Sequence, residues 1–273
     1  MKPDLFEAPD YYLLDDLFTE EHKLVRDAAR SWVKRSVSPI IEDYAQRAEF
    51  PTEIIAGLAE IGAFGPYIPM EYGGAGLDQI SYGLIMQEIE RGDSGVRSTA
   101  SVQSSLVMYP IFAYGTEEQK QTYLHPLASG EKIGAFLLSE PEAGSDATMQ
   151  RTTAEEKGDH YLLNGTKNWI TNGQTASTYL VMAQTDRELK HKGIRAFIVE
   201  STAEGFSVIR KEEKMGIRAS DTDQLAFDSV RVRMTLGRPA SRGVGSSSAN
   251  AQYSGARISS NSHIPPSKRS MSS

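Results

Sequence analysis

The spacing of apolar residues changes near Gly130, and this change limits the fold more than any other feature of the chain. Before it, apolar residues recur at helical intervals behind residues that commonly cap helices, namely Thr19, Asp78 and Thr116. After it come short β-rich runs separated by turns, over residues 133–138, 152–157, 160–163, 179–184, 194–200 and 225–232. The pattern predicts an α+β multidomain chain, with a helical domain over residues 1–130 and a β-barrel or sandwich domain over residues 131–233.

The helical half carries several start and stop signals. Pro51-Thr52 opens a second helix, and residues 101–114 form another that is bent or ended near Pro110. Thr116-Glu117-Glu118-Gln119 is a capping-box pattern that opens a helix interrupted at His125-Pro126.

Asn164-Gly165 is the strongest hairpin signal in the β-rich half. It lies between two β-rich runs, residues 160–163 and 166–171. We therefore predict a tight turn at this dipeptide.

The last forty residues differ from the rest of the chain. From Met234 the sequence is rich in Ser, Gly, Ala, Arg and Pro, and no acidic residue follows Asp228. Such a segment has little to bury, so residues 234–273 are expected to form a low-complexity, disordered tail. A functional basic arm and an altered reading frame are the alternatives.

Composition excludes several classes of function. A formal net charge of -7 opposes general nucleic-acid binding, and the absence of cysteine excludes disulfides and thiolate metal sites. The five histidines lie far apart, so no metal site is expected. No apolar run approaches the roughly 20 residues of a membrane span, and the acidic N-terminal sequence lacks signal-peptide features. These features favour a cytoplasmic enzyme.

Two short runs combine hydroxyls, glycines and flat or apolar side chains at the ends of expected strands. They are Ser139-Glu140-Pro141-Glu142-Ala143-Gly144-Ser145-Asp146 and Lys167-Asn168-Trp169-Ile170-Thr171-Asn172-Gly173. Trp169 can stack its indole on a ring system, and Thr171, on the same strand face, can offer its hydroxyl to a ring heteroatom. Gly144 permits close approach of the backbone, whose N–H groups can bind a phosphate or a carbonyl. These residues suit a large, flat, polar-edged cofactor; the alternative is two polar turns beside a core tryptophan.

Together the two runs resemble the flavin-binding segments of the acyl-CoA dehydrogenase family in order, spacing and residue type. A third run, Met215-Gly216-Ile217-Arg218-Ala219-Ser220-Asp221-Thr222, resembles another part of that family's middle domain, and the resemblance covers roughly residues 15 to 233. The resemblance implies an oxidoreductase that removes one hydrogen from each of two adjacent carbons of an acyl-CoA thioester. It implies FAD as the cofactor, with Thr171 near the N5 atom that accepts hydride, bound by Phe136, Leu138, Ser139, Gly144, Ser145, Trp169, Ile170 and Thr171.

The resemblance points to two substrates. The run Arg91-Gly92-Asp93-Ser94-Gly95-Val96-Arg97-Ser98, with Ser101-Val102-Gln103-Ser104-Ser105, is similar to glutaryl-CoA dehydrogenase. There the matching arginine and its neighbouring serines face the far carboxylate of the acyl chain, which implies substrate contacts for Arg97, Ser98 and Ser101, with Ser145 on the CoA portion. The alternative is a structural ion pair of Arg97 with Asp93 or Glu88. From Glu140 onward the chain is more similar to short-chain, butyryl-type members.

In this family a helical third domain carries the catalytic glutamate, donors to the thioester oxygen, contacts to the adenine half of FAD and the tetramer core. We find no counterpart after Val232, so the fold is expected to be truncated before the C-terminal helical bundle. The catalytic residue is therefore unknown, and neither Glu88 nor Glu140 has a motif-based claim to the role. Since loss of a general base commonly costs about 10²–10⁴ in rate, little or no activity is expected from this chain alone.

The sequence leaves three hypotheses. The first is FAD-dependent dehydrogenation of glutaryl-CoA, or next of a short-chain acyl-CoA, with an electron-transfer flavoprotein as acceptor. This family forms homo-oligomers, although the missing domain argues against its tetramer. The second is a non-catalytic flavin- or acyl-CoA-binding fragment that associates with an intact homologue. The third is binding of nucleic acid or an anionic surface through the tail, which the acidic body opposes, so no nucleic-acid partner is expected.

Overall fold

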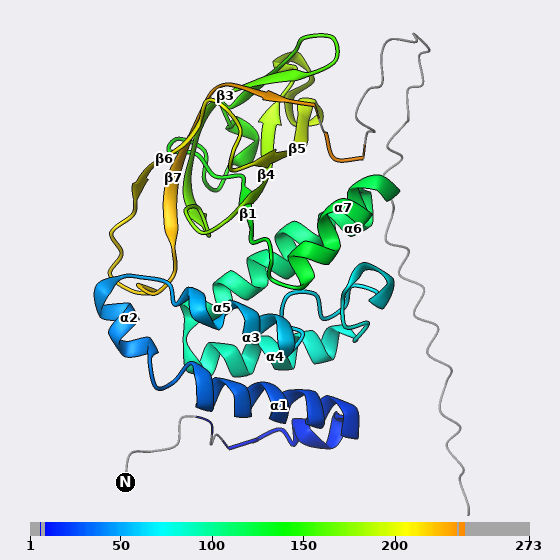
Figure 1. Ribbon diagram of the computed structural model, residues 1–273, viewed down its shortest axis with the longest axis vertical. Helices are drawn as coiled ribbons and strands as arrows, with labels where there is room; N and C mark the ends of the chain where they lie inside the picture. The colour runs from blue at the N-terminus through cyan, green and yellow to red at the C-terminus, as the bar shows by residue number, and fades with distance from the viewer. Residues whose placement is uncertain (1–5, 7–8, 234, 238–273) are drawn as a thin grey trace, which may run out of the picture. The chain divides into compact units, whose positions relative to one another are not determined.

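The computed structural model describes residue 6, residues 9–233 and residues 235–237 (Figure 1). Its helical part contains α1 (Glu20–Ser36), α2 (Ile41–Arg47), α3 (Ile55–Glu60), α4 (Gln79–Gly92), α5 (Ser94–Ser101), α6 (Tyr109–Tyr114) and α7 (Glu117–Ala128). A π-helical segment, Val102–Met108, joins α5 to α6. Short 3₁₀ segments lie at Leu14–Leu17, Thr52–Ile54, Met70–Tyr72, Ala147–Met149 and Arg187–Gly193.

The predicted N-terminal caps are confirmed. The Thr19 hydroxyl accepts from the backbone N–H of His22 in α1, and the Asp78 carboxylate accepts from Ser81 in α4. Thr116 forms the expected capping box with Gln119 at the start of α7. Asp78 also lies 2.8 Å from Nε2 of His22, so the two caps join the N-terminal ends of α1 and α4.

Two helix predictions differ from the structure at proline. Helical structure begins at Ser94, before the predicted residue 101, and does not end at Pro110 but continues to Tyr114. The π-helical segment Val102–Met108 ends two residues before this proline, and such a segment changes the hydrogen-bond partners of the backbone at the point where the proline lacks an N–H. Pro126 likewise does not interrupt α7, which continues to Ala128.

The β part is one curled sheet, which follows the helical part in the chain (Figure 1). Its strands are β1 (Gly134–Leu137), β2 (Thr153–Glu156), β3 (Tyr161–Thr171), β4 (Thr178–Gln184), β5 (Ile194–Glu200), β6 (Phe206–Lys211) and β7 (Thr222–Val232). The order across the sheet is β1-β4-β2-β3-β7-β6, with β5 paired to β4. Strands β1 and β4 are parallel, whereas β3 is antiparallel to both β2 and β7. The predicted class, helices followed by a barrel-like β part, is confirmed.

The hairpin predicted at Asn164-Gly165 is wrong, because β3 runs through both residues. Gly165 has φ +151°, and a Cβ atom there would lie 2.7 Å from Cα of Thr152, so this close approach requires glycine. The Asn164 side chain accepts a hydrogen bond from the backbone N–H of Ser229 at 2.8 Å, where the pairing of β3 with β7 shifts. The dipeptide therefore forms a bulge, and the chain turns between β2 and β3 at residues 157–160 instead.

Buried contacts connect the helices to the sheet. The fully buried Gln103 side chain donates to the carbonyls of Leu127 and Lys132 and accepts from the N–H of Gly134, at 2.6–2.9 Å. Gly134 packs so closely that a Cβ there would lie 2.6 Å from Val107. The π-helical segment, the end of α7 and the start of β1 are thus fixed to one another.

No helix within the described residues is long and apolar enough to cross a membrane.

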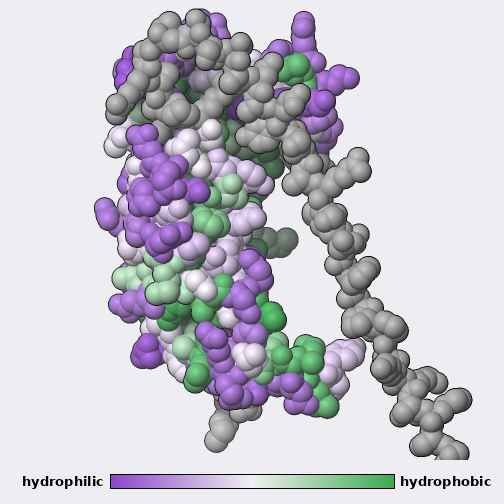
Figure 2. Space-filling model, turned by 90° about the vertical axis from the view of Figure 1, so that its right-hand side faces the viewer, coloured by the Kyte–Doolittle hydropathy of each residue, from purple (hydrophilic) through white to green (hydrophobic). Residues whose placement is uncertain are grey.

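On the face that Figure 2 shows, hydrophobic residues gather toward the lower end, where Figure 1 places α1. The predicted disordered tail lies outside the described residues, apart from residues 235–237. The helices end at Ala128 and the first strand begins at Gly134.

Candidate functional site

The three runs singled out in the sequence meet in the structure. The backbone N–H of Asn168 donates to the carbonyl of Ser139 at 2.9 Å, which joins the first run to the second. Thr171 pairs with Thr222, which joins the second run to the third. At Gly95 in α5 a Cβ atom would lie 2.7 Å from the backbone nitrogen of Ser220, so the third run packs against the helix that carries Arg97.

Trp169 lies on a bulge near the end of β3. The register between β3 and β7 shifts between Lys167 and Ile170, and Trp169 has φ +60°, a left-handed conformation that is uncommon for a bulky residue. Trp169 is 56% exposed. The tryptophan is therefore not the core residue of the alternative interpretation, and its ring is available to a planar ligand.

The loop beside it has an open, polar outer side. Glu140 and Ala143 exchange two backbone hydrogen bonds of 3.1 Å, which forms a tight turn. Gly144 and Ser145 follow with exposed backbone, and a Cβ at Gly144 would meet no atom within 4 Å. Such a loop can receive a bulky polar ligand.

The remaining predicted cofactor residues differ in exposure. Phe136, Leu138, Ser139 and Thr171 are half-buried. Ile170 is only 2% exposed and belongs to the core, so in this structure it offers little surface to a ligand.

Below the loop lies a buried ion pair that sequence reasoning missed. The Lys167 ammonium, with no exposed side-chain surface, donates to the Leu138 carbonyl at 3.0 Å, to Glu140 at 2.8 Å and to Gln150 at 2.9 Å. The Glu140 carboxylate also accepts from the backbone N–H groups of Arg151 and Thr152. Burial lowers the pKa of Lys167, and the hydrogen bond and charge of Glu140 oppose this effect. Burial acts to raise the pKa of Glu140, but its hydrogen bonds, first of all the one from Lys167, leave that pKa lowered.

A second missed cluster lies next to the end of β3. Asp221 accepts hydrogen bonds from the backbone and hydroxyl of Thr175 at 2.7 and 2.6 Å. The N–H of Gln174 donates to both Asp221 and Asp223. Burial, followed by the hydrogen bond and charge of Asp221, raises the pKa of Asp223 to about 8.

The predicted substrate arginine is paired, but with neither residue considered from the sequence. Nε of Arg97 lies 2.5 Å from the Glu90 carboxylate, and its NH1 donates to the Ser101 hydroxyl at 3.3 Å. Asp93 instead caps α5. The structure thus brings Arg97 and Ser101 together, while the Ser98 carbonyl accepts from the Ser101 hydroxyl.

Neither glutamate weighed as a base is available for that role. Glu88 is fully buried, and both its oxygens accept from Arg30 at 2.9 Å. Glu140 is bound by Lys167. A carboxylate committed to a buried ion pair cannot easily accept a substrate proton.

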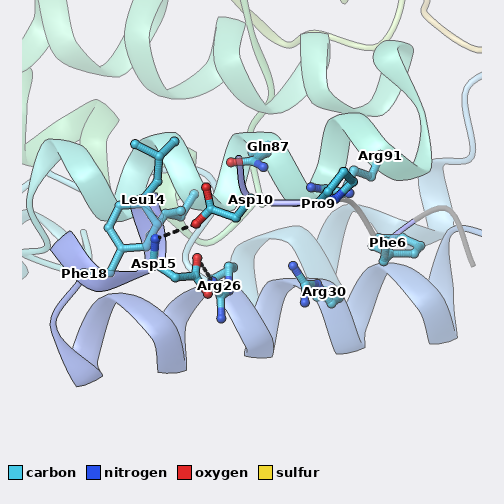
Figure 3. A pocket seen from close by; sticks show the side chains of 11 residues that line it. Phe6, Pro9, Asp10, Leu14, Asp15, Phe18, Arg26, Arg30, Gln87 and Arg91 are labelled. Atoms are coloured by element: carbon cyan, nitrogen blue, oxygen red, sulfur yellow. Dashed lines mark hydrogen bonds and ion pairs between the residues drawn. The ribbon is translucent and has the colours of Figure 1, made fainter. Parts of the chain in front are cut away.

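A cavity of about 580 Å³ lies between α1, α4 and the segment before α1 (Figure 3). Figure 3 shows Arg26 and Arg30 from α1 and Arg91 from α4 among its lining residues. Asp15 binds Arg26 and Glu88 binds Arg30, which offsets their charge. The cavity is lined by none of the predicted site residues, and we assign it no function.

Comparison with known proteins gives consistent matches. The family model of the acyl-CoA dehydrogenase N-terminal domain matches residues 19–131, and that of the middle domain matches residues 135–230. A short-chain specific acyl-CoA dehydrogenase of Clostridium acetobutylicum is 44% identical over 221 residues, 80% of this chain and 58% of that protein.

Two solved structures have the same fold. A glutaryl-CoA dehydrogenase of Mycobacterium smegmatis in complex with FADH2 gives a TM-score of 0.77 at 40% identity, covering 81% of this chain and 56% of that one. Butyryl-CoA dehydrogenase of Megasphaera elsdenii gives 0.77 at 38% identity, covering 82% and 60%. The chain spans between 52% and 58% of the length of the curated relatives that it matches.

Proposed function

Since the chain belongs to the acyl-CoA dehydrogenase family, we propose that it binds FAD and an acyl-CoA thioester and serves the α,β-dehydrogenation of that thioester. The observation that carries the proposal is the exposed indole of Trp169 beside the open loop at Gly144. FAD contains a planar ring system and a polar chain, which need a flat aromatic surface and a polar surface next to each other.

The residues around Trp169 and the loop at Gly144 suit FAD. Trp169 offers an exposed aromatic face, Thr171 offers a hydroxyl, and the loop at Gly144 and Ser145 offers exposed backbone and a further hydroxyl. Phe136, Leu138, Ser139 and Ile170 complete the proposed set. FAD, when bound, supplies the acceptor for the hydride that leaves the β-carbon.

The chain's own residues hold and orient the ligands. Trp169 stacks, with a gain of about 0.5–1.5 kcal/mol beyond burial, and fixes the plane of the ring. Thr171 donates a hydrogen bond at the edge of that plane, and Ser145 contacts the CoA portion. The left-handed backbone of Trp169 keeps the indole directed away from the core.

For the substrate we propose glutaryl-CoA ahead of a short straight-chain acyl-CoA. Arg97 and Ser101 lie together and offer guanidinium and hydroxyl donors to a carboxylate, with Ser98 beside them. Glu90 currently holds Arg97, so a bound dicarboxylate must share or replace that partner. An electron-transfer flavoprotein is the proposed acceptor, and the family's homo-oligomerisation is proposed for this chain too.

A second candidate follows from the committed glutamates. Because Glu88 and Glu140 are both held in ion pairs, binding without turnover is an alternative function. The chain would then act as a flavin- and acyl-CoA-binding partner of an intact homologue. Co-purification with such a homologue, and no activity when alone, distinguishes this candidate from the first.

Titration with FAD tests the proposal. The purified chain should retain flavin absorbance through a desalting column, and the bound flavin should quench the emission of Trp169, which is far more exposed than Trp32 at 4%. Protein that emerges colourless from excess FAD, with unchanged tryptophan emission, overturns the proposal.

A further inference from the structure

We propose that the buried Lys167–Glu140 ion pair positions the loop of residues 139–152 for the flavin, which makes Lys167 and Glu140 positioning residues of the site. The inference rests on the proposed function, since it names two residues that prepare the flavin surface without contributing to it. Neither residue was assigned a role from the sequence.

The geometry ties both ends of the loop to one ammonium group. Lys167 donates to the Leu138 carbonyl where the chain leaves β1, and to Glu140 two residues later. It also donates to Gln150 near the return of the chain to β2. All three N–H bonds of the ammonium are thus used, two on the loop and one on Leu138 directly before it.

Glu140 adds hydrogen bonds at the far end of the loop. Its Oε2 accepts from the N–H of Arg151 at 2.5 Å and its Oε1 from that of Thr152 at 3.0 Å. Between these anchors, Gly144, Ser145 and Thr148 remain exposed. The loop is therefore fixed at its base and open at its tip, as a preformed ligand surface requires.

The pair also connects the loop to Trp169. Lys167 precedes the bulge that carries the indole, and Asn168 donates its N–H to Ser139. Two adjacent residues of β3, Lys167 and Asn168, therefore hold the loop next to the indole that follows them in the chain. A change in the position of Lys167 alters the distance between the two proposed flavin contacts.

The competing explanation is that the pair only stabilises the fold. Removing one partner of a buried pair leaves an uncompensated charge, whereas replacing both by apolar residues often restores stability. Apolar replacements cannot hold the Leu138 carbonyl or the N–H groups of Arg151 and Thr152. The effect of the ion pair on stability can therefore be measured separately from its effect on the position of the loop.

The experiment compares Lys167→Met, Glu140→Gln and the double variant Lys167→Met/Glu140→Met with the wild type. The matched control is the double replacement of Lys132 and Glu200 by Met, which removes another Lys–Glu pair, of 3.2 Å, outside the loop. Three quantities are measured: the melting temperature, the FAD dissociation constant, and amide hydrogen exchange at Arg151 and Thr152 without flavin. Glu140→Gln keeps the residue's size and serves where Lys167→Met does not fold.

In the double variant we expect the melting temperature to recover relative to Lys167→Met. Exchange at Arg151 and Thr152 should stay fast, and FAD affinity should stay lower by about tenfold or more, because a loop without these hydrogen bonds must be ordered when the flavin binds. The control should change neither exchange nor affinity. The inference is overturned if exchange and FAD affinity recover together with the melting temperature. If no variant and no wild-type protein binds FAD, the proposed function fails, whereas the exchange data still decide whether the pair holds the loop.

Discussion

The buried carboxyl pair of Asp221 and Asp223 should make the stability of the chain fall as pH rises. The two residues are 4% and 0% exposed, and they share the N–H of Gln174. With the pKa of Asp223 raised to about 8 by burial and by Asp221, the pair holds one proton at neutral pH. Two charges would otherwise face each other in a site with little water.

The sign of the effect follows from the proton balance. An aspartate in the unfolded chain has a pKa near 3.9, so between about pH 4 and pH 8 the native state holds a proton that the unfolded state has released. The stabilisation is fully present below about pH 4 and is lost progressively until about pH 8. At about 1.4 kcal/mol per pH unit, the free energy of unfolding drops by at most roughly 3 kcal/mol between pH 6 and pH 8. This corresponds to a decrease of about 5–10 °C in melting temperature.

Asp223→Asn should remove this dependence. Asparagine has the shape of the protonated acid, can accept from Gln174 and can donate to Asp221. We expect similar melting temperatures for variant and wild type near pH 4, and a variant that is about 5 °C or more above the wild type at pH 8. Asp228→Asn is the matched control, because Asp228 lies exposed on the same strand, β7, and changes the charge equally.

Thermal unfolding followed by circular dichroism between pH 4 and pH 9, at constant ionic strength, measures these differences. The wild-type and Asp223→Asn curves should diverge between about pH 4 and pH 8, whereas the Asp228→Asn curve should stay parallel to the wild type. Parallel curves for all three proteins would refute proton sharing. So would an Asp223→Asn variant that is less stable at every pH.

Three further predictions follow. Trp169→Ala should weaken FAD binding by roughly tenfold, because stacking and apolar contact are both lost; unchanged retention of flavin, measured by absorbance after desalting, would remove the stacking role. Arg97→Met should weaken binding of glutaryl-CoA by roughly ten- to hundredfold with little change for butyryl-CoA, measured by calorimetry; equal losses contradict a carboxylate site. Gly165→Ala should destabilise the chain by roughly 2 kcal/mol or more, because its Cβ would overlap Thr152, and a melting temperature equal to that of the wild type would show that the close approach is absent.

The sequence predicted the fold best where local chemistry and tertiary structure agree. Thr19 and Asp78 cap helices because each has a free N–H within reach, a condition visible in a few neighbouring residues. The prediction at Asn164-Gly165 was wrong because tertiary packing overrides the turn preference of this dipeptide: Gly165 packs closely against Thr152, directly before β2. Strand β6 was missed because it lies at the end of the sheet order and is mostly exposed, so its residues show no apolar alternation.

The site was predictable only in its exposed part. The runs around Gly144 and Trp169 could be located because aromatic, hydroxyl and glycine residues cluster in them. The burial of Lys167 could not be predicted, because a lysine is mostly exposed unless a partner distant in sequence compensates its charge. Likewise, the pairing of Arg97 with Glu90 crosses the break between α4 and α5, whose geometry the residue spacing does not define.

Flavin binding and proton removal should be separable in this chain. The residues proposed to hold the flavin lie on β1, on the loop that follows it and on the second half of β3, whereas Glu88 and Glu140 are bound to Arg30 and Lys167. Recruiting Glu140 as a base would leave the buried Lys167 ammonium without its partner, at a cost of about 3–5 kcal/mol, and recruiting the buried Glu88 would break its ion pair with the partly exposed Arg30. The chain is therefore expected to bind FAD and yet form enoyl-CoA slowly or not at all. Turnover by this chain alone at the rate of an intact relative would show that a carboxylate other than these two removes the proton.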